Sequence, residues 1–439
     1  PPPRAAHPPA DRLLPPHDVQ ALTPAHSERW AEAPSAAKAH QSSSTLAGDE
    51  WSSGPWAMLY GVDHLLRTLT AFDSGDDPLA GLPIRTRDDG TVVVRVHPAD
   101  TFDKLLLNGC EGEVWMQDGV TAANLRQNMG SFYQTASPEG QVAVVLGAGN
   151  ISSIAPLDLL FKLFAEGQVS VLKMNPVNDY LGPIFQDIFM PLVTRGFVAF
   201  AYGGVEVGQH LTYHDLVHEI HITGSERTFN AIVYGTGADA EERRQNDDAL
   251  NSRRVTSELG GVGPVIVVPG PWSKGDLSFQ AEHVATMKLH NGGFNCVAAQ
   301  VLILSEGWEH SGPFVDLIKS TIESVAEREP YYPGAVSRVD SAKDSHDEWT
   351  HFGESRTMLT NIRHDEAAVA FKDEFFCSAL AQTSLPETDP EAFLRAAVKF
   401  ANESLFGTLG ANILIHPATL KALGPKFEEI IADLEYGTI

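Results

Sequence analysis

The stretch GQVAVVLGAGN, residues 140–150, is an apolar run that ends in a Gly-Ala-Gly-Asn turn. A short run of β-branched residues before a turn predicts a buried strand. It is followed by the helix-like segment PLDLLFKLFAEG (156–167), by VSVLKMNP (169–176) and, further along, by EIHITGS (219–225). This alternation of short strands and helices predicts a parallel, doubly wound α/β sheet.

The bulk composition restricts the class of protein. A chain of 439 residues exceeds one ordinary domain and predicts two or three lobes, with room for an active site between them. Its formal net charge of −26 would repel nucleic acid and anionic lipid. Three scattered cysteines do not make a disulfide framework or a zinc site, and no apolar run has the length that spans a bilayer. We therefore expect a cytoplasmic protein without nucleic-acid, membrane or metal partners.

The chain divides into three segments of different composition. Residues 1–55 mix Pro, Ala, His and Ser, which predicts an irregular N-terminal arm, with regular structure beginning near Trp56. Residues 56–257 carry the alternating strands and helices, and their polar segment 235–254 is expected to be a surface excursion. Strand-like sequence then returns, so residues 258–439 are expected to form a second lobe.

Cys296 raises the question of chemistry. It is either a small buried residue or a nucleophile, because the environment sets thiol reactivity. A cysteine that attacks a carbonyl needs a donor for the oxyanion and a base. Asn150 follows a predicted parallel strand, at the sheet edge where such folds bind ligands, although a turn or helix-capping role is the alternative. Glu258, beside two glycines, is either a base or a solvated loop carboxylate.

Two motifs together suggest a family. ELGG at 258–261, followed by NGGFNC at 291–296, resembles the aldehyde dehydrogenase superfamily, of which the chain looks like a divergent member. In that family the cysteine and the glutamate of these motifs are the nucleophile and the general base, which the resemblance carries over to Cys296 and Glu258. Asn150 resembles the family's oxyanion-hole asparagine.

The resemblance also implies a fold and a cofactor. Residues 56–257 would form a Rossmann-like nicotinamide cofactor domain, and residues 258–439 an α/β catalytic domain. A lysine stands 23 residues after Asn150, where the family contacts the adenosine ribose of NAD or NADP. ITGS at 222–225 is similar to the segment at the cofactor pyrophosphate, and DEFF at 373–376 to the Glu-x-Phe motif at the nicotinamide ribose. The cofactor-binding residues implied are Lys173, Gly224, Ser225, Glu374 and Phe376.

The family mechanism would begin with attack of the Cys296 thiolate on a small-molecule aldehyde. The Cys296 backbone amide and the Asn150 side chain would stabilise the oxyanion, and hydride would pass to the nicotinamide. Water deprotonated by Glu258 would then hydrolyse the thioester. The resemblance further implies a homodimer or a homotetramer.

Several positions depart from the family pattern. Pro176 replaces a ribose-binding glutamate, so NADP stands beside NAD as the implied cofactor. Phe229 stands where a second glycine is common, and its ring is expected to obstruct the pyrophosphate approach. The Gly-Ala-Gly before Asn150 resembles the acyl-coenzyme A reductase branch. The chain ends at LEYGTI (434–439), so the family's C-terminal oligomerisation segment is expected to be absent.

Two alternatives therefore stand beside aldehyde oxidation. One is a related acyl-coenzyme A or thioester reductase, and the other is a non-catalytic structural subunit. His214 and His218 have a spacing that could hold a metal on a helix, but the apolar alternation after them favours the start of a strand. Cys110 and Cys377 have no comparable neighbours in sequence and are expected to be structural thiols.

Overall fold

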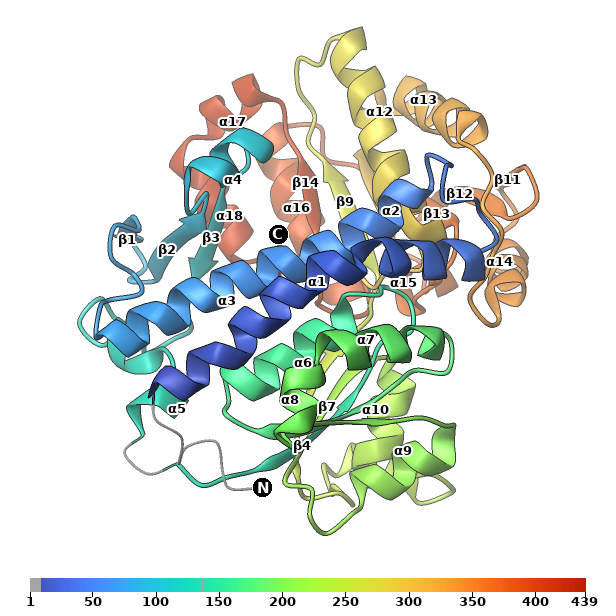
Figure 1. Cartoon of the computed structure of the whole chain (residues 1–439). Helices are drawn as coiled ribbons and strands as arrows, with labels where there is room; N and C mark the ends of the chain where they lie inside the picture. The colour runs from blue at the N-terminus through green and yellow to red at the C-terminus, as the bar shows by residue number, and fades with distance from the viewer. Residues whose placement is uncertain (1–8, 136–137) are drawn as a thin grey trace.

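The computed structural model describes residues 9–135 and 138–439, which form two α/β lobes and a small antiparallel sheet (Figure 1). Helices α1 (Pro9–Ala37) and α3 (Ala57–Ser74) pack side by side across the boundary of the two lobes (Figure 1). None of the described helices combines the length and the apolarity needed to cross a bilayer.

The first lobe is built on a five-stranded parallel sheet. Its strands, in spatial order, are β6 (Val198–Ala201), β5 (Val169–Lys173), β4 (Val142–Leu146), β7 (Glu219–Gly224) and β8 (Arg254–Leu259). Val144 and Val145 are fully buried on opposite faces of β4 because helices cover both sides of the sheet. These helices are α6 (Ile154–Phe164), α7 (Gly182–Ile188), α8 (Met190–Thr194), α9 (Val205–Thr212) and α10 (Glu226–Val233). The alternation that begins at residue 140 is confirmed.

The second lobe contains a six-stranded mixed sheet. Its order is β11 (Trp349–Phe352), β12 (Arg356–Arg363), β13 (Ala379–Leu385), β10 (Ala299–Ser305), β9 (Gly263–Val267) and β14 (Asn412–Leu414), and β11 alone runs antiparallel. One face packs on α12 (Lys274–Leu289) and α13 (Ser311–Ser324). The opposite face packs on α14 (Ala335–Asp344), α15 (Val369–Lys372) and α16 (Pro390–Ser404). Helices α17 (Pro417–Leu423) and α18 (Pro425–Ala432) follow β14.

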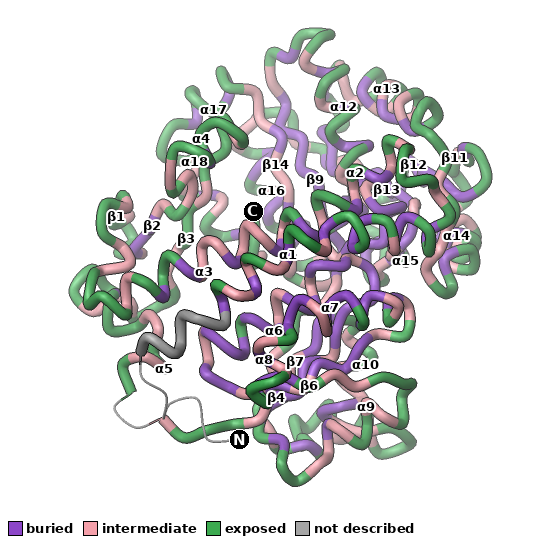
Figure 2. Tube along the Cα trace, in the orientation of Figure 1, coloured by how far each residue is buried: buried purple, intermediate pink, exposed green. Residues whose placement is uncertain are grey.

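A third, smaller sheet lies within the segment expected to form only the first lobe. It consists of β1 (Ile84–Thr86), β2 (Val92–His97) and β3 (Gly112–Trp115), all antiparallel. Short helices α4 (Thr101–Leu106) and α5 (Ser131–Gln134) accompany it. Figure 2 shows the buried positions concentrated along the two large sheets, whereas α4 is mostly exposed.

The expected boundary between the lobes also shifts slightly. The second lobe was expected to begin at Glu258, but β8 pairs with β7 as far as Leu259. Glu258 therefore belongs to the last strand of the first sheet. The polar excursion is as expected an exposed segment, which contains the short helix α11 (Ala240–Gln245).

The N-terminal arm is mainly helical, so the prediction of an irregular arm before Trp56 was wrong. Helix α1 is followed by α2 (Ala47–Trp51) and a π-helical turn over Ser52–Trp56. Val19 and Trp30 are fully buried, and the Trp30 indole packs edge-on against Phe185 of α7 at 4.9 Å between ring centroids. The prediction failed because it relied on composition, whereas packing of an apolar face offsets the low helix propensity of Pro and Ser.

The arm also contacts the loop that follows β4. The Trp30 indole N–H donates to the Ser152 hydroxyl at 2.9 Å, and the Ser153 backbone N–H donates to the Ser53 carbonyl at 3.1 Å. A Cβ on Gly54 would lie 2.9 Å from the Ser152 oxygen, so this close approach requires glycine. The arm is therefore tied to the residues just after Asn150.

We expect Trp30→Ala to destabilise the packing of the arm by about 3–5 kcal/mol, because it removes a fully buried ring and its hydrogen bond. Thermal unfolding and hydrogen exchange of α1 would measure the loss. The control is Trp51→Ala, which removes a 45% exposed ring and should change stability by only about 0.5 kcal/mol. Equal effects of the two substitutions would contradict the assigned packing.

Candidate active site

A cavity of about 1010 Å³ lies at the carboxyl edge of the first sheet and is closed by residues of the second lobe. Parallel strands bring all their carboxyl ends to this edge, which is the usual ligand site of open α/β sheets. Every residue predicted from the sequence to be catalytic or cofactor-binding lines this cavity: Asn150, Lys173, Gly224, Ser225, Glu258, Cys296, Glu374 and Phe376. The fold thus brings together positions that are up to 226 residues apart in the sequence.

The loop before Cys296 has a demanding backbone. Asn291, Gly292 and Gly293 all have positive φ angles, of 51°, 67° and 78°. A Cβ on Gly293 would lie 2.5 Å from the Cys377 carbonyl oxygen, so any other residue would clash with rigid backbone. The glycine lets the loop turn closely over the second sheet and leaves Cys296 half-buried in the cavity wall.

The electrostatic surroundings of Cys296 disfavour its thiolate form. Burial raises the pKa of Cys296 to about 11, and the charges of Glu258 and Glu374 add to the increase. The backbone N–H groups of Cys296 and Val297 act in the opposite direction. A neighbouring base is therefore needed to produce the thiolate.

Asn150 points toward the same loop. Its side-chain amide donates to the Phe294 carbonyl at 2.9 Å, and its own carbonyl accepts from the Asn291 side chain at 3.1 Å and from the Tyr331 hydroxyl at 3.1 Å. Asn150 is 7% exposed. Because an amide group has two N–H donors, the bond to Phe294 leaves one of them free for a ligand.

Glu258 faces the cavity from strand β8, and partial desolvation by the cavity walls raises its pKa. The charge of Asp158 raises this pKa further, and His221 lowers it. The β7–β8 register pairs His221 with Thr256 and Thr223 with Glu258, so these side chains share one face of the sheet.

Asp158 and His221 form a polar cluster that was not predicted from the sequence. Asp158 accepts a hydrogen bond from Thr223 at 2.9 Å and lies 3.5 Å from the His221 ring, whose other nitrogen is 2.9 Å from the Thr256 hydroxyl. A histidine inside an apolar strand was a weak signal for this cluster. Its link to Asp158 depends on how α6 packs on the sheet.

Glu374 lines the same cavity as Glu258, and its carboxylate lies against Gly260. A Cβ on Gly260 would lie 2.2 Å from this carboxylate, so a side chain at position 260 would displace the Glu374 carboxylate. Burial raises the pKa of Glu374 to about 7, against the opposing charges of Lys288 and Arg338. Its buried Oε1 accepts no hydrogen bond within the described chain. This open acceptor in the cavity wall fits a ligand hydroxyl.

The other half of the cavity offers a polar cradle. Burial lowers the pKa of Lys173, at the end of β5, and Asp179 and Glu206 oppose this change. Gly224 and Ser225 are exposed at the start of α10, whose Thr228 N–H donates to the Ser225 hydroxyl at 3.3 Å. This arrangement, with a lysine and a helix start, suits an anionic or hydroxylated ligand.

Phe229 does not obstruct this cradle as the sequence suggested. It is partly buried and packs against the apolar cluster of Val144, Ile220 and Ile222 beneath α10. Pro176 and Thr228 line the cavity, but Phe229 is not part of its wall. The helical position of the ring directs it to the sheet, which the motif comparison did not reveal.

Two further lining residues were missed. Tyr332 and Arg338 contact Phe376, whose ring centroid lies 5.0 Å from that of Tyr332. The Arg338 Nε donates to the Phe376 carbonyl at 3.2 Å, and its buried Nη2 has no hydrogen-bond partner among the described residues. A lone arginine on an amphipathic helix gives no sequence signal of such a position.

The two histidines with metal-like spacing and the two remaining cysteines do not line the cavity. His214 and His218 lie in the loop between α9 and β7, where their rings accept the backbone N–H groups of Leu216 and Val142 at 3.2 and 3.1 Å. Cys377 is buried behind the Cys296 loop, and Cys110 is exposed far from the cavity lining.

A family model and two curated relatives match parts of this chain. The model of the aldehyde dehydrogenase family matches residues 113–334. Aldehyde dehydrogenase LUC3 of Fusarium sp. is 27% identical over 174 residues, which cover 39% of this chain and 32% of the relative. A probable coniferyl aldehyde dehydrogenase of Pseudomonas aeruginosa is 25% identical over 218 residues, covering 49% and 41%. The matched segments thus span a third to two fifths of these relatives.

Solved structures share the fold over nearly the whole chain. The γ-glutamyl-γ-aminobutyraldehyde dehydrogenase of Burkholderia cenocepacia superposes with a TM-score of 0.66 at 18% identity, covering 99% of this chain and 76% of that one. A Mycobacterium tuberculosis aldehyde dehydrogenase complexed with NAD+ gives a TM-score of 0.64 at 15% identity, covering 99% and 78%. The expected fold class, a Rossmann-like domain plus an α/β catalytic domain, is confirmed.

We expect Asp158→Asn to lower the pKa of Glu258, because it removes a negative charge that disfavours ionisation of this carboxyl group. The shift can be measured by NMR titration of the Glu258 side-chain carboxyl carbon. His221→Ala is a control of opposite sign and should raise the same pKa. An unchanged titration in both variants would show that the cluster does not act on Glu258.

Proposed function

The chain belongs to the aldehyde dehydrogenase family, and we propose that it oxidises a small-molecule aldehyde to a carboxylic acid with NAD or NADP as the hydride acceptor. The observation that carries the proposal is the convergence of Cys296, Asn150 and Glu258 on one cavity together with the candidate cofactor residues. The names of the relatives agree with this reaction class.

In the first step, Cys296 is proposed to attack the aldehyde carbon. The raised pKa of the thiol means that a base must remove its proton, and Glu258 is close enough to influence that pKa. A bond forms between Sγ and carbon, and the carbonyl oxygen becomes an oxyanion. The second N–H of Asn150 and the backbone N–H of Cys296 are the proposed donors to this oxygen.

The cofactor half of the cavity would hold the oxidant. A bound nicotinamide cofactor would accept the hydride from the thiohemiacetal carbon on Cys296, leaving a thioester. Lys173, Gly224, Ser225, Glu374 and Phe376 are the proposed binding residues, and the open acceptor of Glu374 fits a ribose hydroxyl. Pro176 supplies no carboxylate, whereas Asp179 and Glu206 lie near Lys173, so both NAD and NADP stay candidates.

In the last step, Glu258 is proposed to remove a proton from water. The water oxygen bonds to the thioester carbon, the C–S bond breaks, and the Cys296 thiolate and the carboxylic acid are released. The cavity walls raise the pKa of Glu258, which makes its ionised form a stronger base at neutral pH. The same desolvation shifts the lower limit of the pH range for hydrolysis upward.

We expect Cys296→Ser to reduce aldehyde-dependent NAD(P)H production by more than about 1000-fold, because a hydroxyl is a much weaker nucleophile in this setting. Absorbance at the reduced nicotinamide band would measure the rate. Cys377→Ser is the matched control, since Cys377 is a thiol behind the same loop but does not line the cavity, and its activity should stay within about threefold. Full activity of Cys296→Ser would refute the assignment.

We expect Glu258→Gln to slow the first burst of NAD(P)H and to stop turnover after it, because the base near Cys296 is lost and no base activates water for hydrolysis. Rapid-mixing kinetics would show the burst, and mass spectrometry would show the acyl group on Cys296. Coenzyme A-dependent turnover that is insensitive to Glu258→Gln would instead favour the acyl-coenzyme A reductase alternative. If calorimetry showed no binding of NAD or NADP, the result would favour the other alternative, a non-catalytic structural subunit.

A further inference from the structure

A buried ion pair of the N-terminal arm lies directly behind the Cys296 loop. The side chains of Lys38 and Glu50 are 5% and 3% exposed, and the Lys38 Nζ lies 2.8 and 2.9 Å from the two carboxylate oxygens. The same Nζ donates to the Asn291 side-chain oxygen at 2.9 Å. Residues 38 and 291 are separated by 253 positions in the sequence. No part of the proposed mechanism uses Lys38.

Asn291 transmits this contact to both lobes. Its side-chain N–H groups donate to the Asn150 carbonyl at 3.1 Å and to the Phe294 carbonyl at 3.3 Å. The Phe294 carbonyl is the same group that accepts the Asn150 side chain. Asn291 therefore touches the oxyanion donor and the loop of the nucleophile at once.

Lys38 is one of the groups that fix which way the Asn291 amide faces. An ammonium group can only donate hydrogen bonds, so it binds the oxygen of the amide and not the NH₂ group. The Tyr331 hydroxyl lies 3.2 Å from this oxygen and 3.1 Å from the Asn150 carbonyl, and its one proton is shared between these two acceptors. With the oxygen on the Lys38 side, the NH₂ group faces three acceptors, the Asn150 and Phe294 carbonyls and the Asn295 side-chain oxygen.

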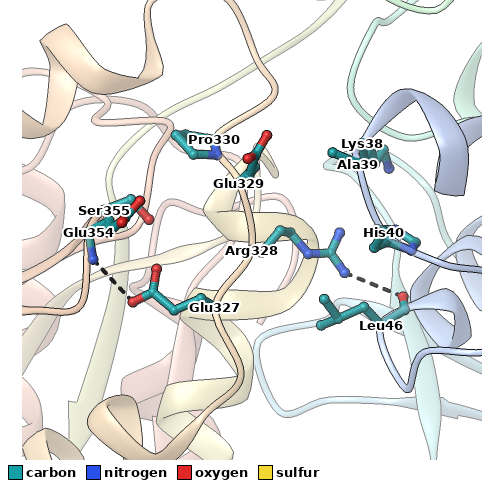
Figure 3. A pocket seen from close by; sticks show the side chains of 10 residues that line it. All are labelled: Lys38, Ala39, His40, Leu46, Glu327, Arg328, Glu329, Pro330, Glu354 and Ser355. Carbon is teal, nitrogen blue, oxygen red and sulfur yellow. Dashed lines mark hydrogen bonds between the residues drawn. The ribbon is translucent and has the colours of Figure 1, made fainter.

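The ion pair is held in place by a second contact between the arm and the catalytic lobe. Arg328 bonds Asp49 at 2.7 Å and lies 3.6 Å from Glu50, and Asp49 accepts the Asn291 backbone N–H at 3.1 Å. Figure 3 shows Arg328 directed toward Lys38, His40 and Leu46 across a pocket of about 340 Å³. None of the residues that line this pocket also lines the Cys296 cavity.

We propose that Lys38 is a positioning residue, which acts through Asn291 to align the Asn150 side chain with the Cys296 loop. The proposal rests on the proposed function, since it concerns the geometry of the oxyanion donor. Loss of the ammonium group removes a charged donor from the Asn291 side-chain oxygen, so the amide is held less firmly against its acceptors. The Asn150 carbonyl and the Phe294 carbonyl then lose a common donor, and the alignment of the two lobes at the reacting atoms loosens.

The test is a double-mutant cycle between Lys38→Met and Asn291→Gly. Glycine tolerates the φ of 51° at position 291, so that this variant removes the side chain without backbone strain. Lys38→Met should reduce kcat by about 10- to 100-fold while KM for the cofactor changes less than about twofold. In the Asn291→Gly background the same substitution should change kcat by less than about threefold. Equal losses in both backgrounds would overturn the proposal.

Two variants separate positioning from stability. Lys162→Met removes another fully buried lysine, which pairs with Glu219 at the opposite edge of the first sheet. It should lower the melting temperature without lowering kcat by more than about twofold. If Lys38→Met alone leaves Glu50 too destabilising for folding, Lys38→Met with Glu50→Gln removes both charges and enters the same cycle.

A measurement without turnover keeps the proposal distinct from the proposed function. The rate of alkylation of Cys296 by iodoacetamide, followed by peptide mass spectrometry, reports the loop geometry even if no aldehyde is oxidised. Lys38→Met should change this rate by at least about fivefold, and by less in the Asn291→Gly background. Unchanged alkylation in a folded Lys38→Met variant would refute the positioning role, whereas an inactive wild type with the expected alkylation pattern would refute only the proposed function.

Discussion

The side-chain amide of Asn291 is the contact on which the geometry of the site depends. It joins three parts of the chain, because it accepts from Lys38 of the arm, donates to Asn150 of the first lobe and lies in the loop of Cys296. Its left-handed backbone is supported by the bond from its N–H to Asp49. A buried amide with several partners has one favourable orientation. Asn291 therefore fixes how the arm, Asn150 and the Cys296 loop lie relative to one another.

The acidic character of the cavity follows from the way the lobes close. Glu258 reaches the cavity from the first lobe and Glu374 from the second, where its carboxylate lies against Gly260. Burial raises the pKa of both carboxyl groups, and their charges in turn raise the pKa of Cys296. The thiolate of Cys296 is therefore disfavoured by burial and by both carboxylates, so its formation depends on a base and on the charge that a bound ligand brings.

Much of the fold and of the candidate site could be predicted because the signals are local. The strand at 142–146 and the turn at Asn150 are visible in eleven consecutive residues, and parallel strands necessarily place their ends at one edge. The motifs around Glu258 and Cys296 are equally short. By contrast, Phe229 was misjudged because a position relative to a motif does not tell which side of a helix a ring occupies.

The arm could not be predicted, because its structure depends on distant partners. The helical face of Val19 and Trp30 forms only against α3 and α7, and composition alone pointed to an irregular segment. The same limit applies to Lys38 and Asp158, whose roles depend on contacts across 253 and 65 residues. The sequence places neither of them beside a recognisable motif.

The energetics of the Lys38–Glu50 pair suggest why such a contact is kept. Burial lowers the pKa of Lys38, while Glu50 raises it, so the desolvation of the ammonium group is offset only in part by its partner. Buried ion pairs generally add little net stability compared with apolar packing of the same volume, but they distinguish one arrangement from its neighbours. An apolar residue at position 38 could fill the same space and stabilise the arm, but it would leave the Asn291 side-chain oxygen without its charged donor. The charge is therefore better explained by the orientation it enforces than by the stability it adds.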